Sequence, residues 1–325
     1  MKLILPGGTG QLGTILARAF HEAGHEVVVL TRNPTAAPWR TARWDAQTPG
    51  AWATELDGAD AVINLAGRSV NCRYTAANRR AILDSRVQST RAVAAAIADA
   101  PRPPRVWLQM STATIYAHRY DAPNDEATGL IGGAEPDAPD TWRFSIDVAR
   151  AWEAAVAEQA TPQTRKVLLR AAMVMSPDRA GIFDTLLRLV RFGLGGSAAG
   201  GRQFVSWIHH ADFVRAVLWL ITHRDLEGPV NLAAPHPLPN KDFMRALRVA
   251  WGAPLGLPAT AWMLELGASV IRTETELVLK SRRVVPGRLL DSNFAFAFPE
   301  WPSAARELCD AWRRPSSLRA PLSTV

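Results

Sequence analysis

A glycine-rich turn near the N-terminus, Gly7-Gly8-Thr9-Gly10-Gln11-Leu12-Gly13, constrains the fold of this chain more than any other feature. It follows a short apolar run at residues 2–5 and opens a helical pattern over residues 12–23. Glycines in such a turn let a pyrophosphate approach the backbone, where amide groups and the helix dipole favour negative charge. The place of the turn between a strand and a helix therefore predicts a dinucleotide-binding site rather than an incidental loop.

Short apolar runs and longer helical patterns alternate after this turn. The runs lie at residues 26–30, 61–65, 105–110 and 166–169, and the helical patterns at residues 76–98 and 141–159. Apolar strands that alternate with helices are typical of a parallel sheet covered on both faces. The sequence predicts an α/β fold with a Rossmann-type doubly wound parallel sheet.

The pattern changes near residue 181 and suggests a division into domains. We expect a dinucleotide-binding Rossmann-type domain at residues 1–234 that carries a substrate-side insertion at residues 178–203. A smaller, mostly helical C-terminal domain follows at residues 235–312, including a helix over residues 260–280, and residues 313–325 form a tail. Ligands of such sheets bind at the carboxyl ends of the strands, so the substrate is expected between the two domains.

Charge and cysteine content exclude several classes of protein. The net charge is +7, but the basic residues are 33 Arg and only four Lys, scattered without a nucleic-acid-binding signature. The two cysteines, Cys72 and Cys309, form no zinc or disulfide pattern. No run approaches the ~18 apolar residues of a membrane-spanning helix. We expect a cytoplasmic protein that binds a small molecule and no metal, nucleic acid or membrane.

The end of the second predicted strand indicates which dinucleotide is bound. It reads Leu30-Thr31-Arg32, without the acid that holds the ribose hydroxyls in an NAD site. Arg32 can pair with a 2′-phosphate through two hydrogen bonds, and Thr31 can donate a third. The alternative is that Arg32 is simply solvated. The sequence favours NADP(H).

Four segments together resemble the extended short-chain dehydrogenase/reductase superfamily. They are GGTGQLG at 7–13, DAVINLAG at 60–67, STATIY at 111–116 and WIHHAD at 207–212. From residue 1 to about 310, the chain resembles its atypical epimerase-like subgroup, the NAD-dependent epimerase/dehydratase family with a C-terminal helical domain, sometimes labelled cell-division-inhibitor-like. The resemblance implies an NADP(H)-binding oxidoreductase acting on a small polar substrate. It also leaves open a homodimer through the helices at 76–98 and 141–159.

The resemblance implies cofactor contacts outside the glycine turn. Leu65, Ala66 and Gly67 are expected beside the pyrophosphate and the nicotinamide ribose. Asp45 near the adenine, Arg86 toward the cofactor and Val174 beside the nicotinamide complete the implied set. For Arg86 the alternative is an ordinary solvent-facing side chain.

The catalytic pair of this superfamily is missing from the chain. Short-chain dehydrogenases use a Tyr and a Lys four residues later, one helical turn apart, and the Lys lowers the pKa of the proton-exchanging Tyr. The chain has only three tyrosines, at 74, 116 and 120, and none has a Lys four positions later. On the helix predicted at 141–159, Ser145 and Ala149 occupy the two positions.

The proton donor of any reaction is therefore open. Thr112 matches the family's Ser/Thr position, and Tyr116 is the phenol nearest to it in sequence; these two are the catalytic candidates. Glu126 and His209 are alternatives. For Tyr116, Glu126 and His209, a structural interpretation has equal weight. In that interpretation Tyr116 packs at the edge of the core, Glu126 is a solvated loop acid and His209 is a hydrogen-bonded histidine. The competing function is a non-catalytic NADP(H)-binding sensor or partner-binding module.

Overall fold

The computed structural model describes residues 1–136, 138–260 and 276–314. Its centre is a sheet of seven parallel strands in the order β3-β2-β1-β4-β5-β6-β10. The chain runs outward from β1 to one edge and then from β4 to the other, so the order reverses between β1 and β4. The strands are β1 (Lys2–Pro6), β2 (Glu26–Thr31), β3 (Arg40–Arg43), β4 (Ala61–Asn64), β5 (Val106–Thr112), β6 (Arg165–Ala171) and β10 (Gly228–Leu232).

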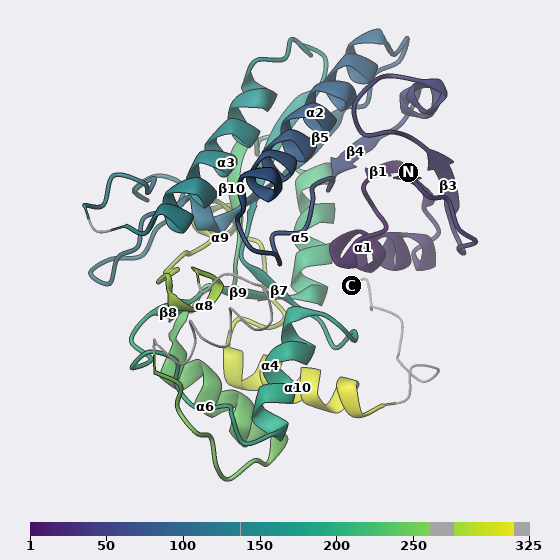
Figure 1. Cartoon of the computed structure of the whole chain (residues 1–325). Helices are drawn as coiled ribbons and strands as arrows, with labels where there is room; N and C mark the ends of the chain where they lie inside the picture. The colour runs from purple at the N-terminus through teal and green to yellow at the C-terminus, as the bar shows by residue number, and fades with distance from the viewer. Residues whose placement is uncertain (137, 261–275, 315–325) are drawn as a thin grey trace.

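Helices cover both faces of this sheet. On one face α1 (Gln11–Glu22) and α5 (His210–Thr222) contribute Ile15, Phe20 and Phe213 to a core shared with the strands. On the other, α2 (Ala76–Asp99) lies alongside α3 (Asp140–Ala157), as Figure 1 shows. The inner strands are apolar on both sides because both sides are covered.

A second group of buried side chains lies beyond the carboxyl ends of the strands. It is formed by α4 (Ile182–Arg191), α6 (Asn240–Trp251) and α10 (Trp301–Arg313), in the lower part of Figure 1. Fully buried Trp207 packs against Trp301, with ring centroids 4.9 Å apart. The shorter elements are η1 (Ala51–Leu56), η2 (Ala113–Ile115), β7 (Met173–Met175), β8 (Phe204–Val205), β9 (Trp207–His209), β11 (Leu238–Pro239), α8 (Glu276–Leu279) and α9 (Gly287–Asp291).

The doubly wound parallel sheet expected from the sequence is confirmed, with strand ends within two residues of the expected ones. The edge strand β3 and helix α10 were not predicted. Strand β3 reads RTAR and pairs only with β2, so it lacks the apolar run that marks an inner strand. The helix predicted at 260–280 lies mostly outside the described residues, as does most of the tail from 313. The division into domains stays a prediction.

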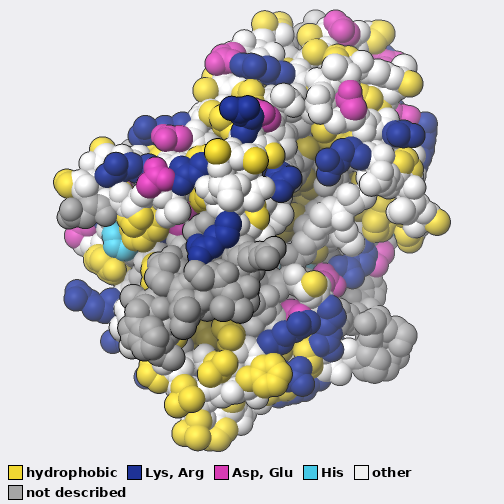
Figure 2. Space-filling view, viewed as in Figure 1, with side chains coloured by type: hydrophobic (Ala, Val, Ile, Leu, Met, Phe, Trp, Pro, Cys, Tyr) yellow, Lys and Arg dark blue, Asp and Glu magenta, His cyan; other side chains and the backbone are white. Residues whose placement is uncertain are grey.

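The surface carries charges of both signs. In Figure 2, Lys and Arg side chains lie beside Asp and Glu over the upper part of the molecule, and hydrophobic side chains gather at its lower end. Among the residues that the structure describes, no helix is both long enough and apolar enough to span a bilayer.

Candidate functional site

The glycine turn connects β1 to α1 at the point where the strand order reverses. Gly7 has φ +73°, a conformation that L side chains rarely adopt, and a methyl group there would lie 2.7 Å from the Ala66 Cα. A methyl group on Gly10 would instead meet only the Gly7 carbonyl oxygen, at 3.9 Å. Space is therefore left beside the backbone of Gly10 at the start of α1, where a pyrophosphate is bound in folds of this kind.

A cavity of about 640 Å³ opens over this turn. The structure brings together there residues from three strand ends that are far apart in sequence. Its walls include Gly7, Thr9, Gly10, Thr31, Arg32, Leu65, Ala66 and Gly67. Of the other four residues of the motif, Gly8 is buried and the remaining three begin α1: Gln11 is exposed, Leu12 packs partly against the core and Gly13 is buried against Gly8.

An adjoining hollow of about 470 Å³ contains both Arg32 and Asp45. The Asp45 carboxylate accepts hydrogen bonds from the backbone N–H groups of Gln47 and Thr48, at 2.8 and 2.9 Å, and from the Thr48 hydroxyl. The Thr48 bonds above all lower the pKa of Asp45 to about 2. Arg43 lines the same hollow and was missed from the sequence, because β3 itself was not predicted.

Arg86 is not the solvent-facing side chain of the alternative reading. Its guanidinium lies 4.9 Å from the Trp152 ring and donates to the carbonyls of Arg68 and Ile82. Burial lowers its pKa to about 10. A methyl group on Gly67 would lie 3.2 Å from the Arg86 Cζ, so this cation lies directly beside the strand end that lines the larger cavity.

A smaller cavity of about 220 Å³ lies at the carboxyl end of β5. Thr112 lines it, and its hydroxyl accepts a hydrogen bond from the Thr114 N–H at 3.1 Å. Ser145, where the family has its Tyr, lines it from α3. The other polar residues of its wall are Tyr74 from the loop before α2, Thr114 of η2, Glu276 of α8 and Arg282, and sequence reasoning assigned none of these four to a site. Arg86, which the family resemblance placed toward the cofactor, lines the same cavity from α2.

Tyr116 does not reach this cavity. Its side chain is 2% exposed, its hydroxyl donates to Asn231 Oδ1 at 2.9 Å, and Arg170 donates to it at 3.0 Å. Burial raises the pKa of Tyr116, which opposes ionisation. Of the two catalytic candidates, the structure places Thr112 in the cavity wall and Tyr116 in a hydrogen-bonded network within the core.

Glu126 and Val174, two further residues named from the sequence, are held by contacts within the fold. Glu126 accepts hydrogen bonds from the backbone N–H groups of Asn231 and Arg288, at 2.7 and 3.3 Å, and burial raises its pKa. It therefore ties loops together rather than lying free in solvent. Val174 is buried in β7 and pairs with Ile208, while its neighbour Met173 lines the small cavity.

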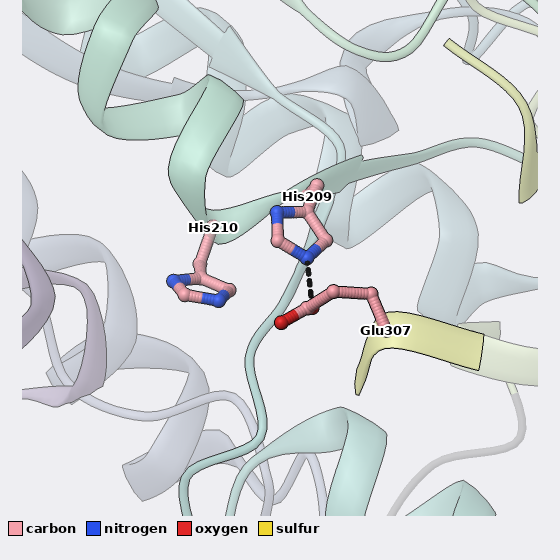
Figure 3. A group of neighbouring side chains, drawn as sticks. All are labelled: His209, His210 and Glu307. Atoms are coloured by element: carbon pink, nitrogen blue, oxygen red, sulfur yellow. Dashed lines mark hydrogen bonds and ion pairs between the residues drawn. The ribbon is translucent and has the colours of Figure 1, made fainter. Parts of the chain in front are cut away.

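His209, His210 and Glu307 form a compact group of metal-ligating side chain types, drawn in Figure 3. Their ligand atoms lie within 4.8 Å of one another. However, His209 Nδ1 accepts a hydrogen bond from the Ala211 N–H and so caps α5. A neutral imidazole that accepts at Nδ1 carries its proton at Nε2, so Nε2 donates to Glu307 at 2.9 Å and has no lone pair for a metal. The group is therefore a structural link between α5 and α10.

His210 should make the stability of the protein depend on pH. Burial lowers its pKa well below 6.5, and its Nδ1 has no hydrogen-bond partner among the described residues. Between pH 6.5 and the lower folded-state pKa, the unfolded chain binds a proton at this site that the folded chain does not. The free energy of unfolding is therefore expected to fall as the pH drops below about 6.5, by up to about 1.4 kcal/mol per pH unit.

Urea unfolding at several pH values measures this effect. His210→Gln is expected to remove part of the loss on acidification, and the exposed His21→Gln variant to leave it unchanged. If the free energy of unfolding depends on pH equally in the two variants, His210 is not the source of the effect.

The sheet, its reversal point and the glycine turn define a dinucleotide-binding Rossmann protein of the short-chain dehydrogenase/reductase type. The model of the NAD-dependent epimerase/dehydratase family matches residues 3–233. The model of a domain of unknown function, DUF1731, matches residues 259–308. The chain belongs to the NAD-dependent epimerase/dehydratase family, as its motifs suggested.

Individual relatives extend this result over nearly the whole chain. The epimerase family protein SDR39U1 of Bos taurus is 32% identical over 313 residues, which cover 95% of this chain and 99% of that protein. The crystal structure of human SDR39U1 (isoform 2) with NADPH superposes with a TM-score of 0.82 at 28% identity, covering 95% of this chain and 99% of that one. The crystal structure of a nucleoside-diphosphate sugar epimerase from Corynebacterium glutamicum superposes with a TM-score of 0.73 at 27% identity, covering 95% of this chain and 58% of that one.

Proposed function

We propose that this protein binds NADP(H) and acts as an epimerase-like oxidoreductase on a small polar substrate. The observation that carries the cofactor assignment is the position of Arg32. It borders both the cavity over the glycine turn and the hollow beside it, where Arg43 offers a second guanidinium. Two guanidinium groups suit a 2′-phosphate, and the acid that lines this hollow, Asp45, has its oxygens engaged within its own turn. The NADPH in the human relative's structure supports the same cofactor.

The proposed cofactor contacts follow the geometry of the two cavities. The turn formed by residues 7–13 would hold the pyrophosphate, Thr31 and Arg32 would contact the 2′-phosphate, and residues 65–67 would contact the nicotinamide ribose. Arg86 and Val174 remain proposed contacts at the nicotinamide end and Asp45 at the adenine end. A homodimer through α2 and α3 and a cytoplasmic location also remain predictions, and sedimentation velocity would test the dimer.

Arg32→Ala is expected to weaken NADPH binding about 10–100-fold and to leave NADH binding nearly unchanged. The reason is that charge-assisted hydrogen bonds to a phosphate contribute about 1.5–3 kcal/mol, and only NADPH carries the 2′-phosphate. Calorimetric titration of both cofactors checks this. The matched control is Arg91→Ala, an exposed α2 arginine that pairs with Glu158 at 3.4 Å. Equal affinity of the wild type for the two cofactors would contradict the assignment.

The competing function is an NADP(H)-binding module without catalysis, favoured by the absent Tyr-x-x-x-Lys pair. A screen of carbonyl compounds and nucleotide sugars, followed through NADPH absorbance, discriminates the two. Turnover of any compound supports the enzyme. Tight NADPH binding without turnover across the screen supports the binding module.

A further inference from the structure

A tyrosine that does not belong to the family's motif reaches the small cavity. Tyr74 comes from the segment just before α2, and its hydroxyl lies 3.5 Å from the Ser145 Oγ. Ser145 occupies the position where the family carries its proton-exchanging Tyr. Thr112, at the family's Ser/Thr position, lines the same cavity. A phenol is thus present beside the position from which the missing one would extend.

The surroundings hold the Tyr74 ring in place. Its ring packs edge-on against Phe144 of α3, with centroids 5.0 Å apart. Arg79 Nε donates to the Tyr74 carbonyl at 2.9 Å. The other two tyrosines cannot serve, because Tyr116 is hydrogen-bonded within the core and Tyr120 is 43% exposed outside this cavity.

Charged groups from α2, from α8 and from the segment after α8 line the same cavity as Tyr74. The guanidinium groups of Arg86 on α2 and Arg282 both interact electrostatically with it. The carboxylate of Glu276 is hydrogen-bonded to the Ser145 hydroxyl and lies 3.8 Å from Arg282 Nη2. Nearby cations favour a phenolate, which is the effect that the family obtains from its Lys. Among the described residues that line this cavity, Arg86 and Arg282 carry the positive charge, and the acid, Glu276, is paired with Arg282.

We propose that Tyr74 is the catalytic proton donor and acceptor of this enzyme, in place of the tyrosine that Ser145 replaces. This inference rests on the proposed function. In the reducing direction, the Tyr74 hydroxyl would donate its proton to the carbonyl oxygen of the substrate, while bound NADPH would supply hydride to the carbonyl carbon. The products are the alcohol, NADP⁺ and a Tyr74 phenolate. The Ser145 hydroxyl and Glu276 then act as positioning residues along the path by which the phenolate regains a proton from solvent. Oxidation is the reverse.

The scarcity of tyrosines allows a test without any substrate. Tyrosinate absorbance near 295 nm is recorded against pH for the wild type and for each Tyr→Phe variant. Tyr74→Phe is expected to remove a step well below pH 10, the ordinary value for tyrosine. Tyr116→Phe and Tyr120→Phe should both retain that step. A Tyr74 step at pH 10 or above would overturn the proposal.

Turnover of a compound found in the substrate screen provides the second readout. Tyr74→Phe is expected to lower kcat about 10²–10⁴-fold with unchanged NADPH affinity and unchanged thermal midpoint, because it removes only the proton transfer. Tyr120→Phe serves as the matched control with full activity. Ser145→Ala is expected to retain turnover and to shift the pH profile of kcat.

The outcomes separate this inference from the proposed function. Turnover that Tyr74→Phe leaves unchanged overturns the role of Tyr74 and leaves the oxidoreductase assignment standing. NADPH binding without any turnover overturns both catalytic assignments. Failure to bind NADPH overturns the proposed function, and the absorbance titration still decides whether Tyr74 ionises below pH 10.

Discussion

Gly13→Ala is expected to destabilise the protein by about 3 kcal/mol or more and to abolish NADPH binding. A methyl group at residue 13 would lie 2.3 Å from the Gly8 Cα and 2.4 Å from the Gly8 carbonyl oxygen. These are backbone atoms, so no side chain rotation relieves the overlap, and α1 must move away from the turn. Such overpacking costs about 1–3 kcal/mol in a core, and more where the backbone cannot yield. Urea unfolding and calorimetric titration measure the two effects.

Gly10→Ala is the matched comparison three residues earlier in the same turn. Gly10 is the N-cap of α1 with φ −74°, which alanine adopts readily, and its methyl group would meet only one atom, at 3.9 Å. We expect it to cost less than about 1 kcal/mol of stability. The methyl group nevertheless enters the space that the pyrophosphate needs, so NADPH affinity should fall at least about 10-fold. Equal destabilisation by the two substitutions would refute the packing argument.

Glu153→Ala is expected to lower the free energy of unfolding by about 3–5 kcal/mol. Arg170 of β6 donates to the Glu153 carboxylate of α3 through Nε and Nη2, at 2.9 and 2.7 Å, and Ser111 donates to it at 2.6 Å. The two charged side chains are only 9% and 13% exposed. Removing one partner leaves the other charge buried without compensation, which is far more costly than losing an exposed pair.

The comparison variant for Glu153→Ala is Asp57→Ala, which breaks the Arg102–Asp57 pair at 2.9 Å. Arg102 is 75% exposed, so solvent screens the pair, and the urea midpoint should change little. If urea unfolding gives similar losses of stability in the two variants, the buried pair stabilises the fold no more than the exposed pair does.

The sheet and the glycine turn at its edge could be predicted because their signals are local. The run at 26–30 is apolar on both faces since helices cover both faces, and the glycine motif follows directly from the first strand. Strand β3 escaped prediction because it is a polar edge strand, and Arg43, at its end, escaped with it. Thr112 and Ser145, which stand where the family resemblance places its Ser/Thr and its Tyr, line one cavity.

The choice of a proton donor shows where sequence proximity misleads. Tyr116 is four residues from Thr112 in the chain, yet the 3₁₀ turn η2 directs it into the core, where Asn231 and Arg170 bind its hydroxyl. Tyr74 is 71 residues from Ser145, yet their hydroxyl oxygens lie 3.5 Å apart. Proximity in space depends on how α2 packs beside α3, which no local pattern encodes.

The sequence alone determined the fold class, the glycine turn after the first strand and the absence of a Tyr-x-x-x-Lys pair. Each of these depends on residue types at short spacing: glycines in one turn, apolar runs of one strand and the residue one helical turn after a tyrosine. Only the tertiary structure decided which polar groups surround the small cavity. Glu276 and Arg282 reach it from more than 130 residues beyond Ser145, because the chain folds back over the carboxyl ends of the strands. Long-range packing selects such neighbours, and it leaves no periodic trace in the sequence.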